Sequence, residues 1–206
     1  MKTERKELFL FRHGMTLANE KHLYCGKTDV PLSETGKNLL LQKKNARYYP
    51  DISHCVLYTS GLQRANQTLA LLYPELSPSA REEPAFQEFN FGDFEMHSYN
   101  ELMHNQDYQN WLQHEVARHN GKNEGADRFS CPNGESWKDF KTRVLLALEK
   151  IMNLHHSVAV FTHGGIIAVI MEHFFPNEQK SLYEWQGDFG SVFKITYDAN
   201  GAILER

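Results

Sequence analysis

Two histidines follow short apolar segments in the same local pattern. Residues 11–14 read Phe-Arg-His-Gly, and residues 161–164 read Phe-Thr-His-Gly. The glycine after each histidine allows the backbone to turn tightly, as it must where a strand ends. If both segments end parallel strands, His13 and His163 share the sheet edge at which open α/β sheets bind ligands. A neutral imidazole is a nucleophile near pH 7 without an activating base, so this pattern suggests covalent catalysis by a histidine.

Two arginines make the same edge suited to an anion. Arg12 directly precedes the first histidine. Arg64 lies in the first turn of a helix that we expect to be capped by Ser60, which fits the capping-box pattern with Gln63. Helical side chains point back toward the helix N-terminus, so Arg64 can lean over the sheet edge. Because guanidinium groups and helix N-termini both favour a phosphate-sized anion, we expect a cationic pocket for a phosphate.

Glu88 supplies a candidate proton donor. Phe89 and Phe91 flank its carboxyl group, and burial among them could raise its pKa toward the range that general-acid catalysis needs. These residue types suggest phosphoryl transfer through a phosphohistidine. The two arginines and His163 would neutralise charge on the transferring oxygens. Glu88 would protonate the leaving oxygen and then, as a carboxylate, orient the hydrolytic water.

Each motif alone has a simpler explanation. The tripeptide 12–14 can be an accidental strand end, His163 can be a helix-cap residue, and a lone arginine usually forms a surface ion pair. Their joint placement at one edge favours catalysis. A metallophosphatase that uses His13, His163 and Asp93 is an alternative, although the sequence has no His-x-His or His-Glu-x-x-His spacing. A catalytically silent phosphate- or nucleotide-binding regulator on the same fold is another.

Strands and helices alternate along the chain, which predicts an α/β fold: a three-layer αβα sandwich around a mostly parallel sheet. We expect strands at 8–11, 55–58 and 158–161, and helices at 32–47, 62–72, 137–151 and 164–175. Residues 191–197 should form an edge strand. The polar residues 97–135 should form a small helical cap inserted in a single domain that spans 1–206.

Several aromatic residues are expected to pack inside the protein. Trp137 opens an apolar stripe at helical spacing, which is typical of a core-facing helix. In the predicted cap, Tyr99, Tyr108 and Trp111 could stack on a base or a sugar. Aromatic residues in a small cap more often form its own core, so we expect packing here too.

Composition excludes several classes of protein. The 206 residues include 22 basic and 26 acidic side chains, a net charge of −4, with no basic cluster for nucleic acid or an anionic membrane. Three cysteines without Cys-x-x-Cys spacing favour a reducing compartment, and the apolar segment 8–11 is too short for a signal sequence or a membrane span. We therefore expect a cytoplasmic protein that acts on a small phosphorylated metabolite, with the choice between a monomer and a homodimer left open.

The motifs together resemble the histidine phosphatase superfamily, in its phosphoglycerate mutase-like group, over about residues 8–197. The matching segments are 12–16 with Asn19, 24–26, 60–65, 67–68, 91–95 with Glu88, 133–136 and 162–165. The resemblance implies a phosphoglycerate mutase-like fold that works without a metal or another cofactor. It also implies that His13 is the phosphorylated nucleophile and that Glu88, rather than Asp93 or Glu95, is the proton donor.

The resemblance extends to the residues around the nucleophile. It implies that phosphate is bound by Arg12, Asn19, Arg64 and His163. It further implies that the substrate contacts Cys25, Gly26 and Gly164.

Within the superfamily, segments 24–33, 91–96 and 133–136 resemble the α-ribazole-5′-phosphate phosphatases of cobalamin biosynthesis. Broad-specificity sugar phosphatases and phosphoglycerate mutases share the same core, so function must be decided by the site. Mutases of the family carry adjacent arginines in the cap, whereas the segment here offers only the isolated Arg118, Lys122 and Arg128. We therefore expect a hydrolase rather than a mutase.

Overall fold

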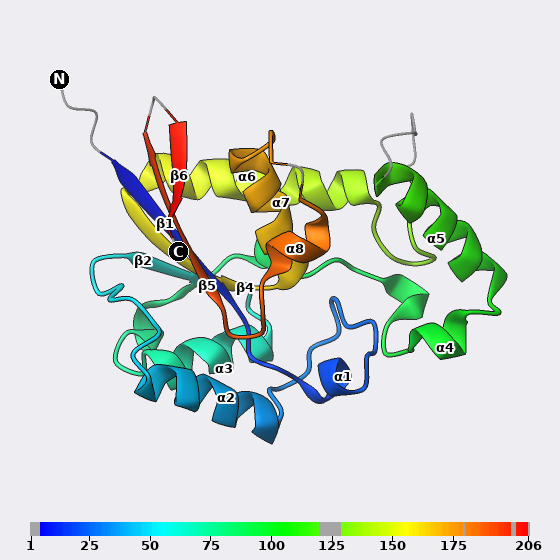
Figure 1. Cartoon of the computed structure of the whole chain (residues 1–206), viewed down its shortest axis with the longest axis horizontal. Coiled ribbons are helices and arrows are strands. Elements are labelled where there is room, and N and C mark those ends of the chain that lie inside the picture. The colour runs from blue at the N-terminus through cyan, green and yellow to red at the C-terminus, as the bar shows by residue number, and fades with distance from the viewer. Residues whose placement is uncertain (1–4, 120–128, 179, 199–200, 206) are drawn as a thin grey trace.

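A mixed sheet lies at the centre of the protein, with helices on both of its faces (Figure 1). The computed structural model describes residues 5–119, 129–178, 180–198 and 201–205. Across these residues the strands are β1 (Lys6–Arg12), β2 (Val56–Thr59), β3 (Arg81–Glu82), β4 (Ser157–Thr162), β5 (Val192–Asp198) and β6 (Gly201–Glu205). Their order is β3-β2-β4-β1-β5-β6. Strands β3, β2, β4 and β1 pair in parallel, β5 pairs antiparallel with β1, and β6 pairs antiparallel with β5, so the predicted mostly parallel sheet is confirmed.

Helices connect the strands and cover the sheet. They are α1 (Leu17–Glu20), α2 (Glu34–Asn45), α3 (Gln63–Leu72), α4 (Tyr99–Leu102), α5 (Gln106–His119), α6 (Trp137–Leu154), α7 (Gly164–Phe174) and α8 (Leu182–Gln186). Short 3₁₀ helices occur at Ser77–Ser79, Pro84–Phe86 and Gly92–Phe94. Ser33 caps α2, its hydroxyl accepting a hydrogen bond from Gly36 N at 3.1 Å.

The residues of β1 alternate between two hydrophobic cores. Leu8 and Leu10 pack in the core that contains buried residues of α6 and α7. Phe9 and Phe11 pack in the core that contains buried residues of α2 and α3. An apolar side chain at every central position is what a strand covered on both faces requires. The three-layer αβα arrangement is therefore confirmed.

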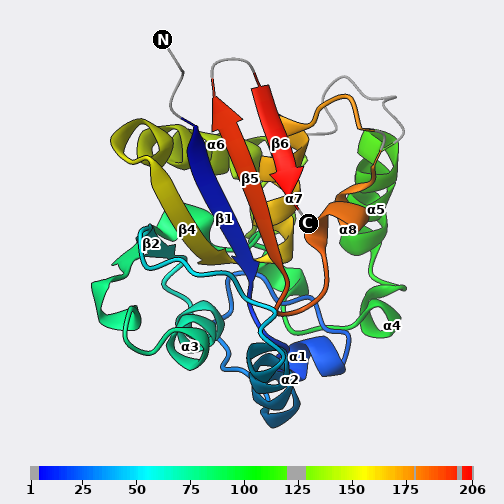
Figure 2. The ribbon, with the colours of Figure 1, turned by 60° about the vertical axis from the view of Figure 1, so that its left-hand side comes forward.

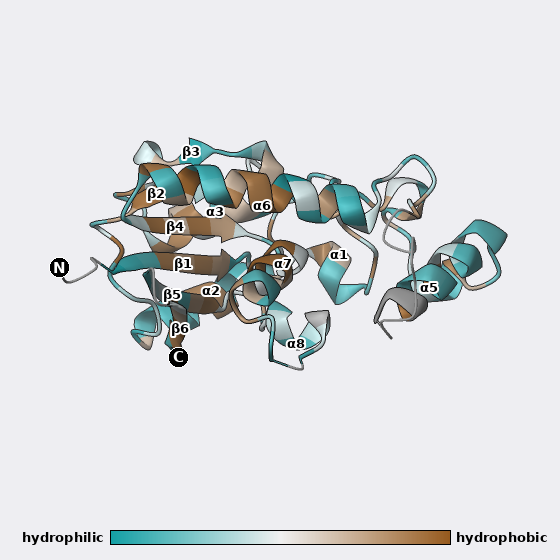
Figure 3. Ribbon diagram, turned by 90° about the horizontal axis from the view of Figure 1, so that it is seen from above, coloured by the Kyte–Doolittle hydropathy of each residue, from teal (hydrophilic) through white to brown (hydrophobic). Residues whose placement is uncertain are grey.

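The carboxyl ends of the parallel strands open toward the helices that follow them. Helix α1 follows β1, α3 follows β2 and α7 follows β4. Figure 3 shows the hydrophobic strands in the interior and, beyond their carboxyl ends, the largely hydrophilic helix α5. This end of the sheet is where ligands bind in open α/β folds.

Two local predictions are wrong. Helix α3 has Leu62, not Ser60, as its N-cap residue. The reason is Gly61, whose φ of +83° turns the chain before the helix can start. Asp29 then accepts the hydrogen bond of the first helical residue, Gln63 N, at 2.7 Å. Likewise, β5 is not an edge strand, because β6 pairs along its outer side (Figure 2).

The predicted cap segment contains α4 and α5, which lie beyond the carboxyl ends of the strands (Figure 1). Residues 120–128, and with them Lys122 and Arg128, fall outside the described residues, as does the side chain of Arg118. Whether the segment is an insertion in a single domain stays a prediction. No helix within the described residues is long and apolar enough to cross a membrane.

Candidate active site

The ends of β1 and β4 bring the two predicted histidines together. Arg12 pairs with Thr162 in the parallel register, and His13 N donates a hydrogen bond to Thr162 O at 2.9 Å. His163 is the N-cap residue of α7, and its ring centroid lies 5.1 Å from that of His13. Both side chains are buried. The sheet register therefore joins residues that are far apart in the sequence into one cluster.

His13 has the protonation pattern of a nucleophile. Its Nδ1 lies 2.6 Å from Gly14 O, and because a carbonyl oxygen only accepts, Nδ1 must carry the proton. Burial and, next, the charge of Arg64 hold the pKa of His13 well below its usual range. The ring is therefore neutral at physiological pH, with its lone pair on Nε2.

Arg64 and His163 form a buried pair beside this nucleophile. Arg64 Nε donates to His163 Nδ1 at 3.2 Å, so the ring proton of His163 is on Nε2, which donates to Ser60 Oγ at 2.8 Å. The other end of the guanidinium group donates to Gly26 O at 2.5 Å and Thr28 O at 2.9 Å. Burial and the same arginine keep the pKa of His163 well below its usual range. Ser60, predicted as a helix cap, instead orients His163.

Arg12 brings a second positive charge to the cluster. Its Nη1 donates to Gly187 O at 2.5 Å, and its guanidinium carbon lies 4.2 Å from the ring centroid of Phe189. Its buried Nε has no hydrogen-bond partner among the described residues. The guanidinium group of Arg12 lies close to the backbone of residue 164, and this requires glycine there, since a Cβ atom would lie 3.1 Å from the guanidinium carbon. A buried cation with donors to spare is suited to a phosphate.

Glu88 meets the N-terminus of α7. Its Oε2 accepts a hydrogen bond from Gly165 N and its Oε1 accepts one from Phe89 N, both at 2.9 Å. A Cβ atom on residue 165 would lie 2.3 Å from Glu88 Oε1, so glycine is required for this contact. Two backbone donors thus fix the carboxyl group in a defined orientation.

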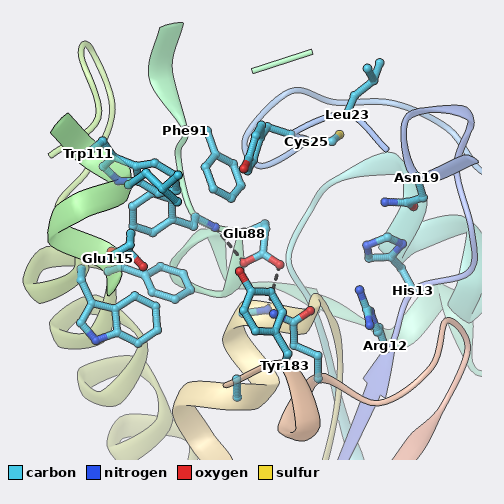
Figure 4. A pocket seen from close by; sticks show the side chains of 18 of the residues that line it. Arg12, His13, Asn19, Leu23, Cys25, Glu88, Phe91, Trp111, Glu115 and Tyr183 are labelled. Carbon is cyan, nitrogen blue, oxygen red and sulfur yellow. Dashed lines mark hydrogen bonds between the residues drawn. The ribbon is translucent and has the colours of Figure 1, made fainter. Parts of the chain in front are cut away.

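These residues line an open cavity of about 450 Å³ with two chemically different ends (Figure 4). At the end that we call the reactive end, the lining residues are Arg12, His13, Asn19, Cys25 and Glu88. At the other, the aromatic end, Figure 4 places Phe91, Trp111 and Glu115, and the lining also includes Leu112, Val116 and Trp137. A nucleophile, a cation and a carboxyl group therefore face the same space as a large apolar wall.

A comparison with known protein families identifies the family to which this chain belongs. A model of the histidine phosphatase superfamily, branch 1, matches residues 8–206 of the chain. The chain belongs to the histidine phosphatase superfamily. It is a phosphatase, and its substrate is a phosphorylated small molecule.

Relatives of this phosphatase have different reactions. An adenosylcobalamin/alpha-ribazole phosphatase of Escherichia coli (strain K12) is 25% identical over 205 residues, which cover 96% of this chain and 93% of the relative. A 2,3-bisphosphoglycerate-dependent phosphoglycerate mutase of Bartonella henselae is 30% identical over 173 residues, which cover 81% and 80%. The crystal structure of the alpha-ribazole phosphatase from Shigella flexneri has a TM-score of 0.78 at 24% identity, covering 97% of this chain and 94% of that one. The last likeness shows the fold.

Two further predicted residues lie at the reactive end of the phosphatase. Asn19 belongs to a capping box, and its Oδ1 accepts hydrogen bonds from Thr16 N at 3.0 Å and from Thr16 Oγ1 at 2.9 Å. Its Nδ2 is therefore the atom suited to a phosphate oxygen. Cys25 is half-buried, and burial raises the pKa of its thiol, which favours the neutral form.

Four predicted site residues support the cavity instead of lining it. The described lining does not include Arg64, His163, Gly26 or Gly164. The ring of His163 contacts that of the lining residue His13, and Arg64 in turn contacts His163. A Cβ atom on Gly26 would lie 1.7 Å from Phe89 O, so this glycine permits a close backbone approach. That Gly26 and Gly164 contact the substrate stays a prediction.

Glu95 has a structural role that the sequence did not reveal. Its carboxylate accepts hydrogen bonds from Lys27 N and Thr28 N, both at 2.6 Å, and from the Thr28 hydroxyl. The same loop offers Gly26 O and Thr28 O to Arg64. Glu95 therefore holds the loop that orients Arg64.

The residues of the alternative metal site are not brought together. Both carboxylate oxygens of Asp93 lie 3.0 Å from Asn133 Nδ2, and Asp93 is not part of the described cavity lining. Among the residues described, no group of three or more histidine, cysteine, aspartate or glutamate side chains could hold a metal ion. A metal site built on His13, His163 and Asp93 is therefore not supported.

Most residues of the aromatic end were not predicted from the sequence to line a binding site. Trp137 lies at the first turn of α6, and although its neighbours in the stripe are buried core residues, it faces the cavity. Trp111 has both roles weighed for it, since it is 7% exposed, contacts the rings of Tyr24 and Phe94, and lines the cavity. Tyr108 is fully buried, as expected for a core residue. The density of aromatic residues between 89 and 111 was the available signal.

Proposed function

We propose that this phosphatase hydrolyses α-ribazole 5′-phosphate through a phosphohistidine on His13, with Glu88 as the proton donor. The observation that carries the proposal is the neutral His13, fixed through Nδ1, in one cavity with Arg12 and Glu88. Such a group needs no further activation to attack phosphorus.

In the first step, Nε2 of His13 attacks phosphorus, and the bond between phosphorus and the leaving oxygen breaks. Glu88 gives its proton to that oxygen, so the product leaves as an alcohol. In the second step, Glu88 takes a proton from water, whose oxygen attacks phosphorus as the P–N bond breaks. Inorganic phosphate leaves and His13 is again neutral. Arg12 stabilises the charge on the oxygens of the transferring phosphoryl group. The positive charge of Arg64, on the far side of His13, stabilises the same phosphoryl oxygens at longer range.

The aromatic end supports the choice of substrate. α-Ribazole 5′-phosphate carries a benzimidazole base on its ribose, a flat apolar group that stacks well on Trp111 and Trp137. Among the described lining residues, the charged side chains besides Arg12 are Glu88 and Glu115, both acidic. A second anionic group, as in phosphoglycerates, would meet like charge there. The E. coli relative named an adenosylcobalamin/alpha-ribazole phosphatase points the same way.

Phosphate release from three substrates tests the proposal. We expect the highest kcat/KM with α-ribazole 5′-phosphate, less with ribose 5-phosphate, which lacks the base, and least with 3-phosphoglycerate. Activity should survive EDTA, and quenched reactions should contain an acid-labile, base-stable phosphoenzyme that His13→Ala abolishes. Equal activity on the first two substrates would refute the substrate assignment, whereas loss of turnover in EDTA would refute the mechanism.

A further inference from the structure

An ion pair at the start of α6 lies behind the candidate proton donor. Arg143 Nε donates to Glu135 Oε2 at 3.0 Å and Arg143 Nη2 donates to Glu135 Oε1 at 2.7 Å. The two side chains are 28% and 15% exposed, so the pair is partly withdrawn from solvent. This two-point geometry is the strongest that an arginine and a carboxylate can make.

The remaining contacts of Arg143 go to the backbone that carries Glu88. Nη1 donates to Ala85 O at 2.7 Å and to Gln87 O at 2.8 Å, and Nη2 donates to Glu88 O at 3.0 Å. All five N–H groups of the guanidinium are thereby used. Glu135 Oε1 also accepts from Asn90 N at 2.7 Å. The pair thus forms hydrogen bonds with the backbone both before and after residue 88.

One peptide group connects the hydrogen bonds of Arg143 to the cavity. The peptide between residues 88 and 89 donates its N–H to Glu88 Oε1, while its carbonyl oxygen accepts from Arg143. Rotation of that peptide would break both hydrogen bonds and would release one oxygen of the carboxyl group. Arg143 and Glu135 themselves are not among the described residues that line the cavity.

We propose that Arg143 and Glu135 are positioning residues that hold the Glu88 carboxyl group toward the leaving oxygen. The assignment rests on the proposed role of Glu88 as the proton donor. A pair that only stabilised the fold would affect every substrate alike, whereas a pair that acts through Glu88 affects substrates according to their need for a proton. Partners that orient the ligands of a catalytic metal typically contribute about 10- to 100-fold to activity, and we expect an effect of the same scale here.

The leaving group separates these two roles. p-Nitrophenolate leaves without protonation, so the transfer of its phosphoryl group to His13, the step that kcat/KM reports, does not need the Glu88 proton, whereas an alkyl alkoxide does. We expect Arg143→Lys and Glu135→Gln to lower kcat/KM for ribose 5-phosphate about tenfold or more and for p-nitrophenyl phosphate less than threefold. Lysine keeps the charge but cannot reproduce the five-donor geometry.

A double-mutant cycle with Glu88→Gln completes the test. If Arg143 acts through Glu88, adding Arg143→Lys to Glu88→Gln causes no further loss with ribose 5-phosphate. Lys141→Met serves as the matched control. Lys141 lies in α6, as Arg143 does, but pairs with Glu172 at 2.9 Å, so its loss should change kcat/KM for neither substrate. Full additivity, or an equal loss on both substrates, would overturn the positioning role. If Glu88→Gln itself showed no leaving-group dependence, the proposed function of Glu88 would fail instead.

Discussion

The two ends of the cavity are built by different kinds of interaction. At the reactive end, directional hydrogen bonds to backbone atoms hold the side chains, as with His13 on Gly14 O and Glu88 on Gly165 N. At the aromatic end, ring contacts dominate, such as those of Trp111 with Phe91 and Phe94 at centroid distances of 6.2 and 5.8 Å. Directional contacts fix the position of reacting atoms, whereas packing defines a shape. We therefore expect the reactive end to set the rate for every substrate and the aromatic end to choose among them.

The largest effect is expected at the nucleophile. His13→Ala removes the atom that attacks phosphorus, so kcat should fall by at least about 10³-fold with α-ribazole 5′-phosphate and ribose 5-phosphate alike. Phosphate release and trapping of the phosphoenzyme measure this, with His104→Ala, an exposed histidine outside the cavity, as the control. A loss confined to one substrate would break the division between the two ends.

A smaller effect on both substrates is expected from the residue beside Glu88. Gly165→Ala places a Cβ atom 2.3 Å from Glu88 Oε1, so the carboxyl group must move. We expect kcat to fall about 10²-fold, the scale of general-acid catalysis. Thermal stability should hold, because alanine favours a helix over glycine by about 1 kcal/mol.

Glu88→Gln provides the reference for that variant. In its background, Gly165→Ala should cause little additional loss, since both act on one group. An unfolded Gly165→Ala protein, or independent losses in the cycle, would show that the glycine serves the fold instead.

Local patterns account for why the reactive end was predictable. A strand that ends in His-Gly is visible within four residues, and two such parallel strands end at the same edge of a sheet. That β1 and β4 are neighbours, which brings the two histidines into contact, is seen only in the structure. Ser60 shows where this fails. Its capping pattern with Gln63 is local, but Asp29 satisfies the helix N-terminus from 34 positions away, and His163 takes the serine hydroxyl. Competition from distant partners cannot be inferred from spacing.

The aromatic end and the sheet edge show a second limit. Trp137 continues the stripe of Phe140 and Val144, and periodicity does not distinguish a core from a cavity on the same helix face. Strand β6 is short, and its pattern alternates around Ile203, which is 53% exposed, so it gave a weak signal. Without it, β5 looked like the outermost strand.

The aromatic end should control selectivity rather than rate. Trp111→Ala removes a wall of the cavity, so kcat/KM for α-ribazole 5′-phosphate should fall about 10- to 100-fold, the scale of losing one aromatic contact. Activity on ribose 5-phosphate, which has no base, should change less than threefold. Tyr99→Ala is the control, because Tyr99 is 51% exposed, contacts Tyr108 and does not line the cavity in the described structure.

The selectivity ratio decides the outcome. Because Trp111 also packs in the core, Trp111→Phe provides a milder variant that keeps an aromatic ring. A parallel loss with both substrates in both variants would mean that the aromatic end supports the reactive end instead of selecting the substrate.

The smallest effect concerns the two buried histidines of the reactive end and appears in stability. In the folded state the pKa values of His13 and His163 lie well below the usual value of about 6.5, mainly because of burial. Below pH 6.5 the unfolded chain therefore binds protons at these positions that the folded protein does not. The stability that these two buried histidines contribute is fully present above that pH and is lost as the pH falls, by up to about 1.4 kcal/mol per pH unit for each histidine.

Urea unfolding between pH 7.5 and 5.5 measures this. The free energy of unfolding should depend less steeply on pH for His163→Asn than for the wild type, and equally steeply for His104→Asn and for Trp111→Ala. An unchanged slope for His163→Asn would mean that His163 takes up a proton as readily in the folded protein as in the unfolded chain, and the contrast between the buried, directional contacts of the reactive end and the packing of the aromatic end would lose its electrostatic basis.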